Sequence, residues 1–344
     1  MRTKFVEIDQ QKEYMAQAGR ILQEGGLVAF PTETVYGLGG DAFNPGSCRK
    51  IYEAKGRPSD NPLIVHICRI EDLKMVAAEV PREAMLLAEK FWPGPLTMIL
   101  PKADRVPYEV TGGLDTVAVR MPNHPIALAL IDAAGGYVVA PSANSSGKPS
   151  PTLAGHVLED LDGRIDMILD GGPVGIGLES TIVDLTTDVP EILRPGYITR
   201  EMLEEVLGQV KTDVTIMSAD TGQAPKAPGM KYRHYAPVGE LTIVAGEPER
   251  VVHWINEKLS QSAGKKTGVI CTDENRDKYL ADVVKNIGKR DDEARIAREL
   301  YRILREFDEE KVEIMYSEAF DTAGVGQAIM NRLLKAAGYH IIYV

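Results

Sequence analysis

Four hydrogen-bonding side chains, Thr32, Glu33, Thr34 and Tyr36, follow the apolar run GGLVAF in the segment PTETVYGLGGDA. Pro31 and Gly37 favour a turn, and Thr and Tyr are common at strand ends, so a plain strand-to-loop turn would explain the segment by itself. Other polar groups stand beside apolar runs in the same part of the chain, and together they point to a ligand site.

Four further stretches have the same character. They are EAKGRPSDNPLIVHI, LDTVAVRMPNHP, VVAPSANSSGKPSP and GLESTIVDLTTDVPEILRPG. Loops at strand ends are where α/β proteins build ligand sites. Cations combined with short hydroxyl and amide side chains suit a polyphosphate, whose charge and oxygens they match. The residues are Lys55, Arg57, Ser59, Asn61, Thr116, Arg120, Ser142, Asn144, Ser145, Ser146, Lys148, Ser150, Ser180 and Arg194.

Arg120 and His66 both lie within apolar strand-like runs, VAVRMP and LIVHI. An unpaired buried charge is very costly, so Arg120 needs an anion, and a ligand carboxylate is one such anion. A lone histidine in an apolar run is more often a satisfied core residue than a ligand-binding one.

The standard nucleotide and hydrolase motifs do not fit. SANSSGKPS has Ser142 in place of the first P-loop glycine, and Pro149 follows Lys148 where Ser or Thr is required. The GxG fragments in GGPVGIG and GVGQAI lack the third glycine of a dinucleotide site. HExxH, GxSxG and clustered His and Cys patterns are absent from the sequence.

The pattern of elements predicts an α/β protein of two domains. Residues 1–210 alternate short Val-, Ile- and Leu-rich runs with turns and a few helices, which predicts a twisted, mixed sheet. Residues 239–344 alternate strand and helix regularly, with helices at PERVVHWINEKLSQ, RDKYLADVVKNIG, DDEARIARELYRILREF and GVGQAIMNRLLKAAG, which predicts a smaller parallel, doubly wound, Rossmann-like domain. Residues 211–238 have the composition of a linker but end in the aromatic and basic KYRHY.

Composition narrows the functional class. The chain has 344 residues, 44% hydrophobic and 26% charged, and a net charge of −11, which argues against indiscriminate binding to nucleic acid. The first twenty residues lack a signal peptide's apolar region, and no window is apolar enough for a membrane span. Three widely spaced cysteines suggest neither disulfides nor a zinc site, so a reducing cytoplasm is expected.

The ordered set PTETVYGLGGDA, KGRPSDNPLIVH, WPGPLTMIL, VAVRMPNHP, APSANSSGKPSPT, ESTIVD and ILRPG resembles the YrdC/Sua5 family of threonylcarbamoyl-AMP synthases. APGMKYRHYAP and the region after it resemble the linker and C-terminal domain of the longer Sua5 type. The resemblance implies formation of L-threonylcarbamoyladenylate and pyrophosphate from L-threonine, bicarbonate or CO2, and ATP with Mg²⁺. A separate tRNA-threonylcarbamoyl transferase would then use the product in the t6A37 modification of tRNA.

The resemblance also implies roles for particular residues. It assigns no nucleophile, because the threonine amine and the carbamate oxygen are themselves the attacking groups, with Lys55 and Arg57 supplying position and charge. The linker would close over the nucleotide as a lid; its simpler alternative role is docking of the second domain. The implied L-threonine residues are Thr34, His66, Arg120, Ala140 and Ser180, and the implied ATP residues are Lys55, Arg57, Asn61, Thr116, Ser142, Asn144, Ser150, Arg194 and Tyr235.

Two alternatives belong to other functional classes: a module that binds double-stranded RNA in the same groove, and a non-catalytic partner in a tRNA-modifying complex. An RNA groove does not need a carboxylate-binding arginine beside a threonine-sized polar pocket, and the negative net charge weakens the electrostatic attraction that dominates RNA affinity. The enzyme is therefore the preferred interpretation.

Overall fold

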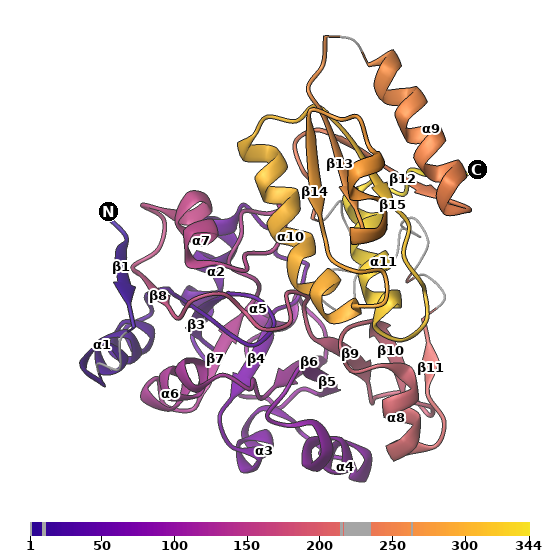
Figure 1. Cartoon of the computed structure of the whole chain (residues 1–344). Helices are drawn as coiled ribbons and strands as arrows, with labels where there is room; N and C mark the ends of the chain where they lie inside the picture. Colours follow the sequence, from indigo (N-terminus) through magenta and orange to yellow (C-terminus); the bar gives the residue numbers. More distant parts are fainter. Residues whose placement is uncertain (1, 9–11, 214–215, 217–234, 263) are drawn as a thin grey trace. The chain divides into compact units, whose positions relative to one another are not determined.

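The structure is a computed structural model that describes residues 2–8, 12–213, 216, 235–262 and 264–344 (Figure 1). These residues form two compact units. The first contains the described residues up to Ser146 and then Ser150–Ile216, and the second contains Gly147–Pro149 and the described residues from Tyr235 to Val344. No helix among the described residues has both the length and the apolar character needed to cross a membrane.

The first unit is built on one mixed sheet of eleven strands, in the order β1-β8-β2-β3-β7-β4-β6-β5-β9-β10-β11. At its centre β4 runs parallel to β6, and β6 runs antiparallel to β5. The strands are β1 (Lys4–Glu7), β2 (Val28–Phe30), β3 (Gly37–Asp41), β4 (Ile64–Ile67), β5 (Leu96–Pro101), β6 (Thr116–Arg120), β7 (Tyr137–Ala140), β8 (Met167–Asp170), β9 (Thr181–Asp184), β10 (Glu191–Arg194) and β11 (Lys211–Thr212).

Local sequence signals set the helices of this unit. In α2, Asn44 caps the N-terminus by accepting a hydrogen bond from the Gly46 amide, and Gly56 ends the helix at φ 61°. This cap places Lys55 in the last turn, beside the glycine that reverses the chain. The helices are α1 (Lys12–Gln23), α2 (Pro45–Lys55), α3 (Leu73–Val76), α4 (Arg82–Phe91), α5 (Tyr108–Thr111), α6 (Pro125–Ala133), α7 (Ala154–Leu161) and α8 (Arg200–Leu207), with a 3₁₀ turn at Ile70–Asp72.

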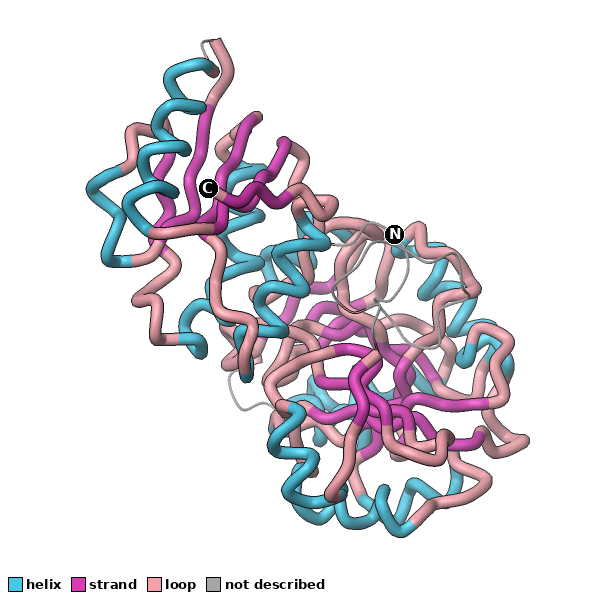
Figure 2. Tube along the Cα trace, turned by 90° about the vertical axis from the view of Figure 1, so that its right-hand side faces the viewer, coloured by secondary structure: helices cyan, strands magenta, loops and turns pink. Residues whose placement is uncertain are grey.

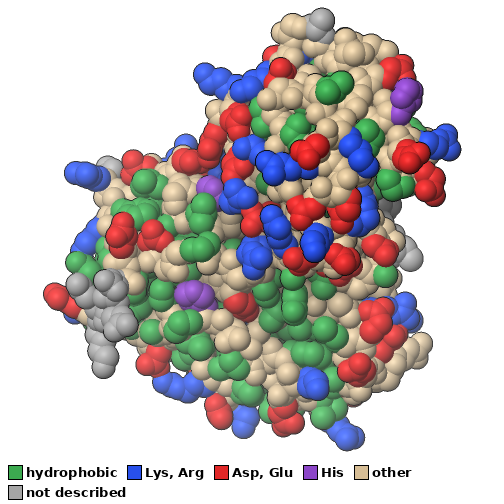
Figure 3. Space-filling view, in the orientation of Figure 1, with side chains coloured by type: hydrophobic (Ala, Val, Ile, Leu, Met, Phe, Trp, Pro, Cys, Tyr) green, Lys and Arg blue, Asp and Glu red, His purple; other side chains and the backbone are tan. Residues whose placement is uncertain are grey.

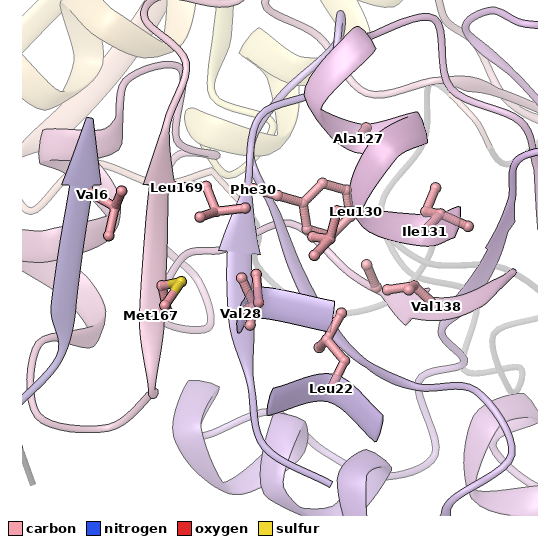
Figure 4. Packing of buried hydrophobic residues seen from close by; sticks show 12 residues of the cluster. Val6, Leu22, Val28, Phe30, Ala127, Leu130, Ile131, Val138, Met167 and Leu169 are labelled. Atoms are coloured by element: carbon pink, nitrogen blue, oxygen red, sulfur yellow. The ribbon is translucent and has the colours of Figure 1, made fainter. Parts of the chain in front are cut away.

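Helices α1 and α6 cover part of the sheet and bury an apolar cluster of the unit (Figure 4). Leu22 of α1 and Leu130 of α6 pack there with Val28, Phe30 and further side chains of the sheet. Apolar burial of this kind is the main source of folding free energy. A second, smaller apolar row crosses the central strands and consists of Ile64, Ala118, Ile99, Ile182 and Leu193.

The second unit has five parallel strands in the order β14-β13-β15-β12-β16. Val269 packs in the cluster with Ile255 of α9, whereas Gly268, the neighbouring residue in β13, lies against Phe307 of α10. Successive strand residues face opposite sides, so α9 and α10 cover opposite faces (Figure 2). The elements are β12 (Glu240–Ala245), α9 (Pro248–Gln261), β13 (Thr267–Cys271), a 3₁₀ helix (Asp273–Lys278), β14 (Val283–Asn286), α10 (Glu293–Glu309), β15 (Ile314–Glu318), α11 (Gly324–Ala336) and β16 (Ile341–Tyr343).

The α/β fold class and the doubly wound second domain are confirmed. The helix predicted at RDKYLADVVKNIG is wrong, because a 3₁₀ helix ends at Lys278 and Val283–Asn286 forms β14, paired in parallel with β13. The β-branched Val283 and Val284 favour a strand at that sheet edge. Most of the predicted linker, 211–238, lies outside the described residues. The domain boundaries drawn from composition therefore stay predictions.

Candidate functional site

His66, Arg120 and Thr97 occupy paired positions on three neighbouring strands, β4, β6 and β5. They share the face that carries the second apolar row, because Ile64, Ala118 and Ile99 lie two residues away on the same strands. Ser180 extends the polar row towards β9, with its hydroxyl oxygen 2.7 Å from that of Thr97. The sheet register therefore brings together three of the predicted threonine-binding residues and adds Thr97.

The PTETVY segment connects β2 to its antiparallel neighbour β3. Thr32 organises this connection, because its hydroxyl accepts from the amides of Thr34 and Val35 and donates to the carbonyl of Val35 at 2.7 Å. The fold of the loop directs the Thr34 hydroxyl towards Arg120, whose Nη1 donates to it at 2.9 Å. Thr34, predicted to face the amino acid, thus belongs to the same buried cluster as Arg120.

The anion that Arg120 requires is supplied in this structure by the chain itself. Nη2 of Arg120 lies 2.6 Å from Oε1 of Glu33, and the two side chains are 5% and 12% exposed. Nε donates to the carbonyl of Gly94 at 3.3 Å. The prediction that Arg120 lies beside an anion is met within the chain by Glu33, and its predicted contact with a ligand carboxylate stays a prediction.

His66 is a neutral hydrogen-bonding group in this cluster. Burial, together with the nearby Arg120 charge, lowers its pKa to about 3. Its Nδ1 lies 3.1 Å from the carbonyl of Ile64, and its ring meets Phe30 edge-on. With so low a pKa, His66 is a poor proton acceptor near neutral pH and is suited to orienting a polar group.

The predicted phosphate-binding residues gather where α2 ends and β7 leads into the SANSSGKPS loop. Nζ of Lys55 donates to the carbonyls of Ser142 and Asn144, both at 2.5 Å. The Ser142 hydroxyl donates to the Asn144 side chain, and Ser146 binds the Lys55 carbonyl through its amide. Lys55 therefore ties the loop to the end of α2, which fixes the hydroxyl and amide groups that follow β7.

The remaining contacts are those of Arg57, Asn61 and Ser150, which are predicted to bind ATP, and of Ala140, which is predicted to bind L-threonine. The Arg57 guanidinium donates to the carbonyls of Asn61 and Pro62, and Asn61 lies three residues before Ile64, the first residue of β4. Ala140 is paired with Ile64 at the last position of β7. The Ser150 hydroxyl donates to the buried Glu179 carboxylate.

One predicted ATP residue and the predicted carboxylate-binding residue lie towards opposite ends of the same strand face. Thr116 and Arg120 are four residues apart on β6 and face the same side, with Ala118 between them. Four residues of strand span roughly 13 Å. Such a span suits a ligand whose phosphates lie towards one end and whose carboxylate lies towards the other.

Arg194 and Tyr235, predicted to bind ATP, have different surroundings. Arg194 donates from Nε to the carbonyl of Ser180 at 3.0 Å and from Nη2 to its hydroxyl at 3.1 Å, so it belongs with the polar row. Tyr235 lies in the second unit, buried and with φ 64°, and stacks on Tyr301 with ring centroids 5.1 Å apart. Its predicted contact with the nucleotide stays a prediction.

Sequence reasoning named Glu33 among the polar side chains after GGLVAF without giving it a binding role, and it did not name Thr97 or Glu179. Thr97 looks like an ordinary strand residue, since Thr favours strands. Glu33 and Glu179 stand directly beside Thr34 and Ser180, so a search for acidic neighbours of those residues would have found them.

Comparison with known proteins agrees with this geometry. The family model described as "Telomere recombination" (Sua5/YciO/YrdC) matches residues 20–196, and the model of the threonylcarbamoyl-AMP synthase C-terminal domain matches residues 198–338. The threonylcarbamoyl-AMP synthase of Bacillus subtilis is 52% identical over 99% of this chain and 100% of its own length. That of Pyrococcus abyssi is 50% identical over 95% of each chain.

A solved structure of P. abyssi Sua5 in complex with L-threonine has a TM-score of 0.94 and 47% identity, and the match covers the whole of both chains. The mixed-sheet unit followed by a parallel doubly wound unit therefore places the chain in the two-domain Sua5 class. The chain belongs to the threonylcarbamoyl-AMP synthase family.

Proposed function

We propose that this chain forms L-threonylcarbamoyladenylate and pyrophosphate from L-threonine, bicarbonate or CO2, and ATP. The observation that carries the proposal is the row of His66, Arg120, Thr97 and Ser180 on the strand face that also carries Thr116. The P. abyssi relative, described as bound to L-threonine, supports the same amino acid here.

In the proposed reaction the chain acts by position and charge. Arg120 binds the threonine carboxylate, while Thr34, His66 and Ser180 offer hydroxyl and imidazole groups to the remaining polar atoms. The threonine nitrogen becomes a carbamate, and a carbamate oxygen displaces pyrophosphate from the α-phosphorus. Holding the reactants aligned contributes about 7–11 kcal/mol to such a step, and Arg57 with Lys55 favours the phosphate charge.

ATP enters as its magnesium complex in this proposal. Among the described residues, no three His, Cys, Asp or Glu side chains are placed to hold a metal ion. Mg²⁺ commonly keeps several waters and binds through phosphates with few protein ligands. The phosphate oxygens of ATP would therefore supply part of the ligands, and waters would supply others.

The deciding experiment measures pyrophosphate release by the full chain with L-threonine, bicarbonate and ATP, and with each omitted in turn. We expect release only when all three are present. Full release without bicarbonate would contradict the carbamate route, and release without threonine would contradict the substrate assignment.

The proposal includes a cytoplasmic location and a separate tRNA-threonylcarbamoyl transferase that consumes the adenylate. The cysteines are free thiols, and burial raises the pKa of Cys48 and Cys271 to about 12, so both are unreactive at neutral pH. Basic and acidic side chains are interspersed on the face shown in Figure 3. That pattern gives no support to the RNA-binding alternative, because an RNA-binding surface is expected to carry a continuous basic patch.

A further inference from the structure

Glu33 and Arg120 form an ion pair whose hydrogen-bonding capacity is not fully used. Oε1 and Nη2 are 2.6 Å apart, but the contact lacks the geometry of a hydrogen bond. Both carboxylate oxygens of Glu33 and the Nη2 of Arg120 are buried and have no hydrogen-bond partner among the described residues.

Such an arrangement lowers the stability of the folded protein, because buried charges are normally compensated by hydrogen bonds as well as by the opposite charge. A small zwitterion supplies both missing partners. Its carboxylate accepts from the Nη2 of Arg120, and its ammonium donates to Glu33. An α-amino acid presents these two groups one carbon apart, which matches two side chains that are already in contact.

We propose that Glu33 binds the ammonium group of the amino-acid substrate and accepts its proton when the nitrogen attacks CO2. This inference rests on the proposed function and adds a catalytic residue to it. It also explains why the PTET segment places a carboxylate directly beside Thr34, which itself contacts Arg120.

The proton balance of the step is complete. The ammonium gives one proton to the Glu33 carboxylate, and the freed lone pair forms the N–C bond as one C–O π bond of CO2 becomes the carbamate oxyanion. The nitrogen then loses its second proton to the hydroxide released when bicarbonate becomes CO2, which yields water. Glu33 returns its proton to solvent after the adenylate forms.

Two histidines are the other candidate proton acceptors near Arg120 and Glu33. His66 is unsuited, because burial and Arg120 hold its pKa far below neutrality. His124 is partly buried, and desolvation lowers its pKa while the Glu33 charge opposes that change. His124 lies beside Gly171, its Cε1 being 3.5 Å from where a Cβ on that glycine would be. Because His124 is close enough for the Glu33 charge to affect its pKa, His124→Gln is the control variant for Glu33→Gln.

The first test is a binding measurement on the full chain. L-threonine is compared by calorimetry with (R)-3-hydroxybutanoate, which keeps the carboxylate and hydroxyl but lacks the amine. Wild type should bind threonine about 10- to 100-fold more tightly, the range expected for a charged hydrogen bond. Equal affinities in wild type would overturn the proposal without requiring any variant.

Three variants test which residue causes the preference for threonine over (R)-3-hydroxybutanoate. Glu33→Gln should bind the two compounds with similar affinity, Glu33→Asp should retain part of the preference, and His124→Gln should retain all of it. Loss of the preference in His124→Gln with retention in Glu33→Gln would assign the ammonium to His124 instead. Thermal unfolding checks that each variant is folded. If a variant is unfolded, the wild-type comparison of threonine with (R)-3-hydroxybutanoate still tests the proposal.

The second test is catalytic. At saturating threonine, Glu33→Gln should lower kcat for pyrophosphate release by about 100- to 10,000-fold, as loss of a general base does. An unchanged kcat with a raised KM would overturn the proton transfer. Failure of wild type to release pyrophosphate would instead contradict the proposed function, and the binding comparison separates the two outcomes.

Discussion

His66 and Arg120 occupy directly paired positions on the parallel strands β4 and β6, and their side chains share one face of the sheet. Burial and the Arg120 charge lower the pKa of His66 from 6.5 to about 3. An unfolded histidine binds a proton below about pH 6.5, whereas the folded chain keeps His66 neutral until the pH is far lower. Folding and proton binding at this residue are therefore coupled.

This coupling predicts loss of stability in acid. Because the folded pKa is depressed, the stabilising contribution is fully present above pH 6.5 and is lost as the pH falls from 6.5 towards 3, by up to about 1.4 kcal/mol per pH unit. His66→Gln removes this contribution. In a Trp254→Phe background, where Trp92 reports on the first unit, urea unfolding should weaken more steeply between pH 6.5 and 4.5 in wild type than in His66→Gln. Parallel pH dependences would contradict a buried neutral His66.

A second prediction concerns Arg120→Ala. The change removes a charged hydrogen bond to the substrate carboxylate, so the KM for threonine should rise about 10- to 100-fold while the KM for ATP changes little. It also leaves the Glu33 carboxylate buried without its partner, which costs about 3–5 kcal/mol of unfolding free energy. Pyrophosphate release at varied threonine and ATP, with a thermal melt, measures both effects. An equal loss of ATP affinity would place Arg120 elsewhere in the site.

The sequence was sufficient to predict that Arg120 lies beside an anion, because a charge within an apolar strand requires one. It did not identify the anion, since whether Glu33 or only a ligand reaches Arg120 depends on how the loop after β2 folds. Likewise, the pairing of His66, Arg120 and Thr97 depends on sheet register between segments far apart in sequence, which local patterns do not specify.

The strand β3 also could not be predicted from its local sequence. Its sequence, GLGGD, has three glycines and lacks the composition of a strand. Glycine fits the close packing there, because a Cβ on Gly39 would lie 3.0 Å from side-chain atoms of both Phe30 and Val138. Tertiary packing therefore overrides local propensity at this strand.

Lys55→Met tests the connection between α2 and the SANSSGKPS loop. Methionine preserves the length of the side chain but removes the donors to the Ser142 and Asn144 carbonyls. We expect amide hydrogen exchange in residues 142–146 to accelerate and the KM for ATP to rise at least tenfold, whereas threonine binding in the absence of ATP is kept. Unchanged exchange in that loop would show that Lys55 does not order it.

Thr97→Val tests the residue that sequence reasoning missed. The substitution keeps the shape of the side chain but removes the 2.7 Å contact with the Ser180 hydroxyl. Loss of a buried hydrogen bond lowers the unfolding free energy by about 1 kcal/mol. Because Ser180 keeps its contact with Arg194, we expect only a several-fold rise in the KM for threonine. A loss as large as that of Arg120→Ala would mean that Thr97 contacts the substrate directly.

Two substitutions of Tyr235 distinguish a structural role of this residue from a nucleotide-binding role. Its ring stacks on Tyr301 and lies 5.8 Å from the Arg332 guanidinium. Tyr235→Phe keeps both ring interactions and removes only the hydroxyl, whereas Tyr235→Ala removes everything. If the hydroxyl binds ATP as the family resemblance implies, Tyr235→Phe should raise the KM for ATP several-fold. Tyr235→Ala should also destabilise the second unit, by roughly 1 kcal/mol for the lost aromatic pair in addition to the lost burial. ATP kinetics in Tyr235→Phe identical to wild type, alongside a destabilised Tyr235→Ala, would leave Tyr235 with an anchoring role alone.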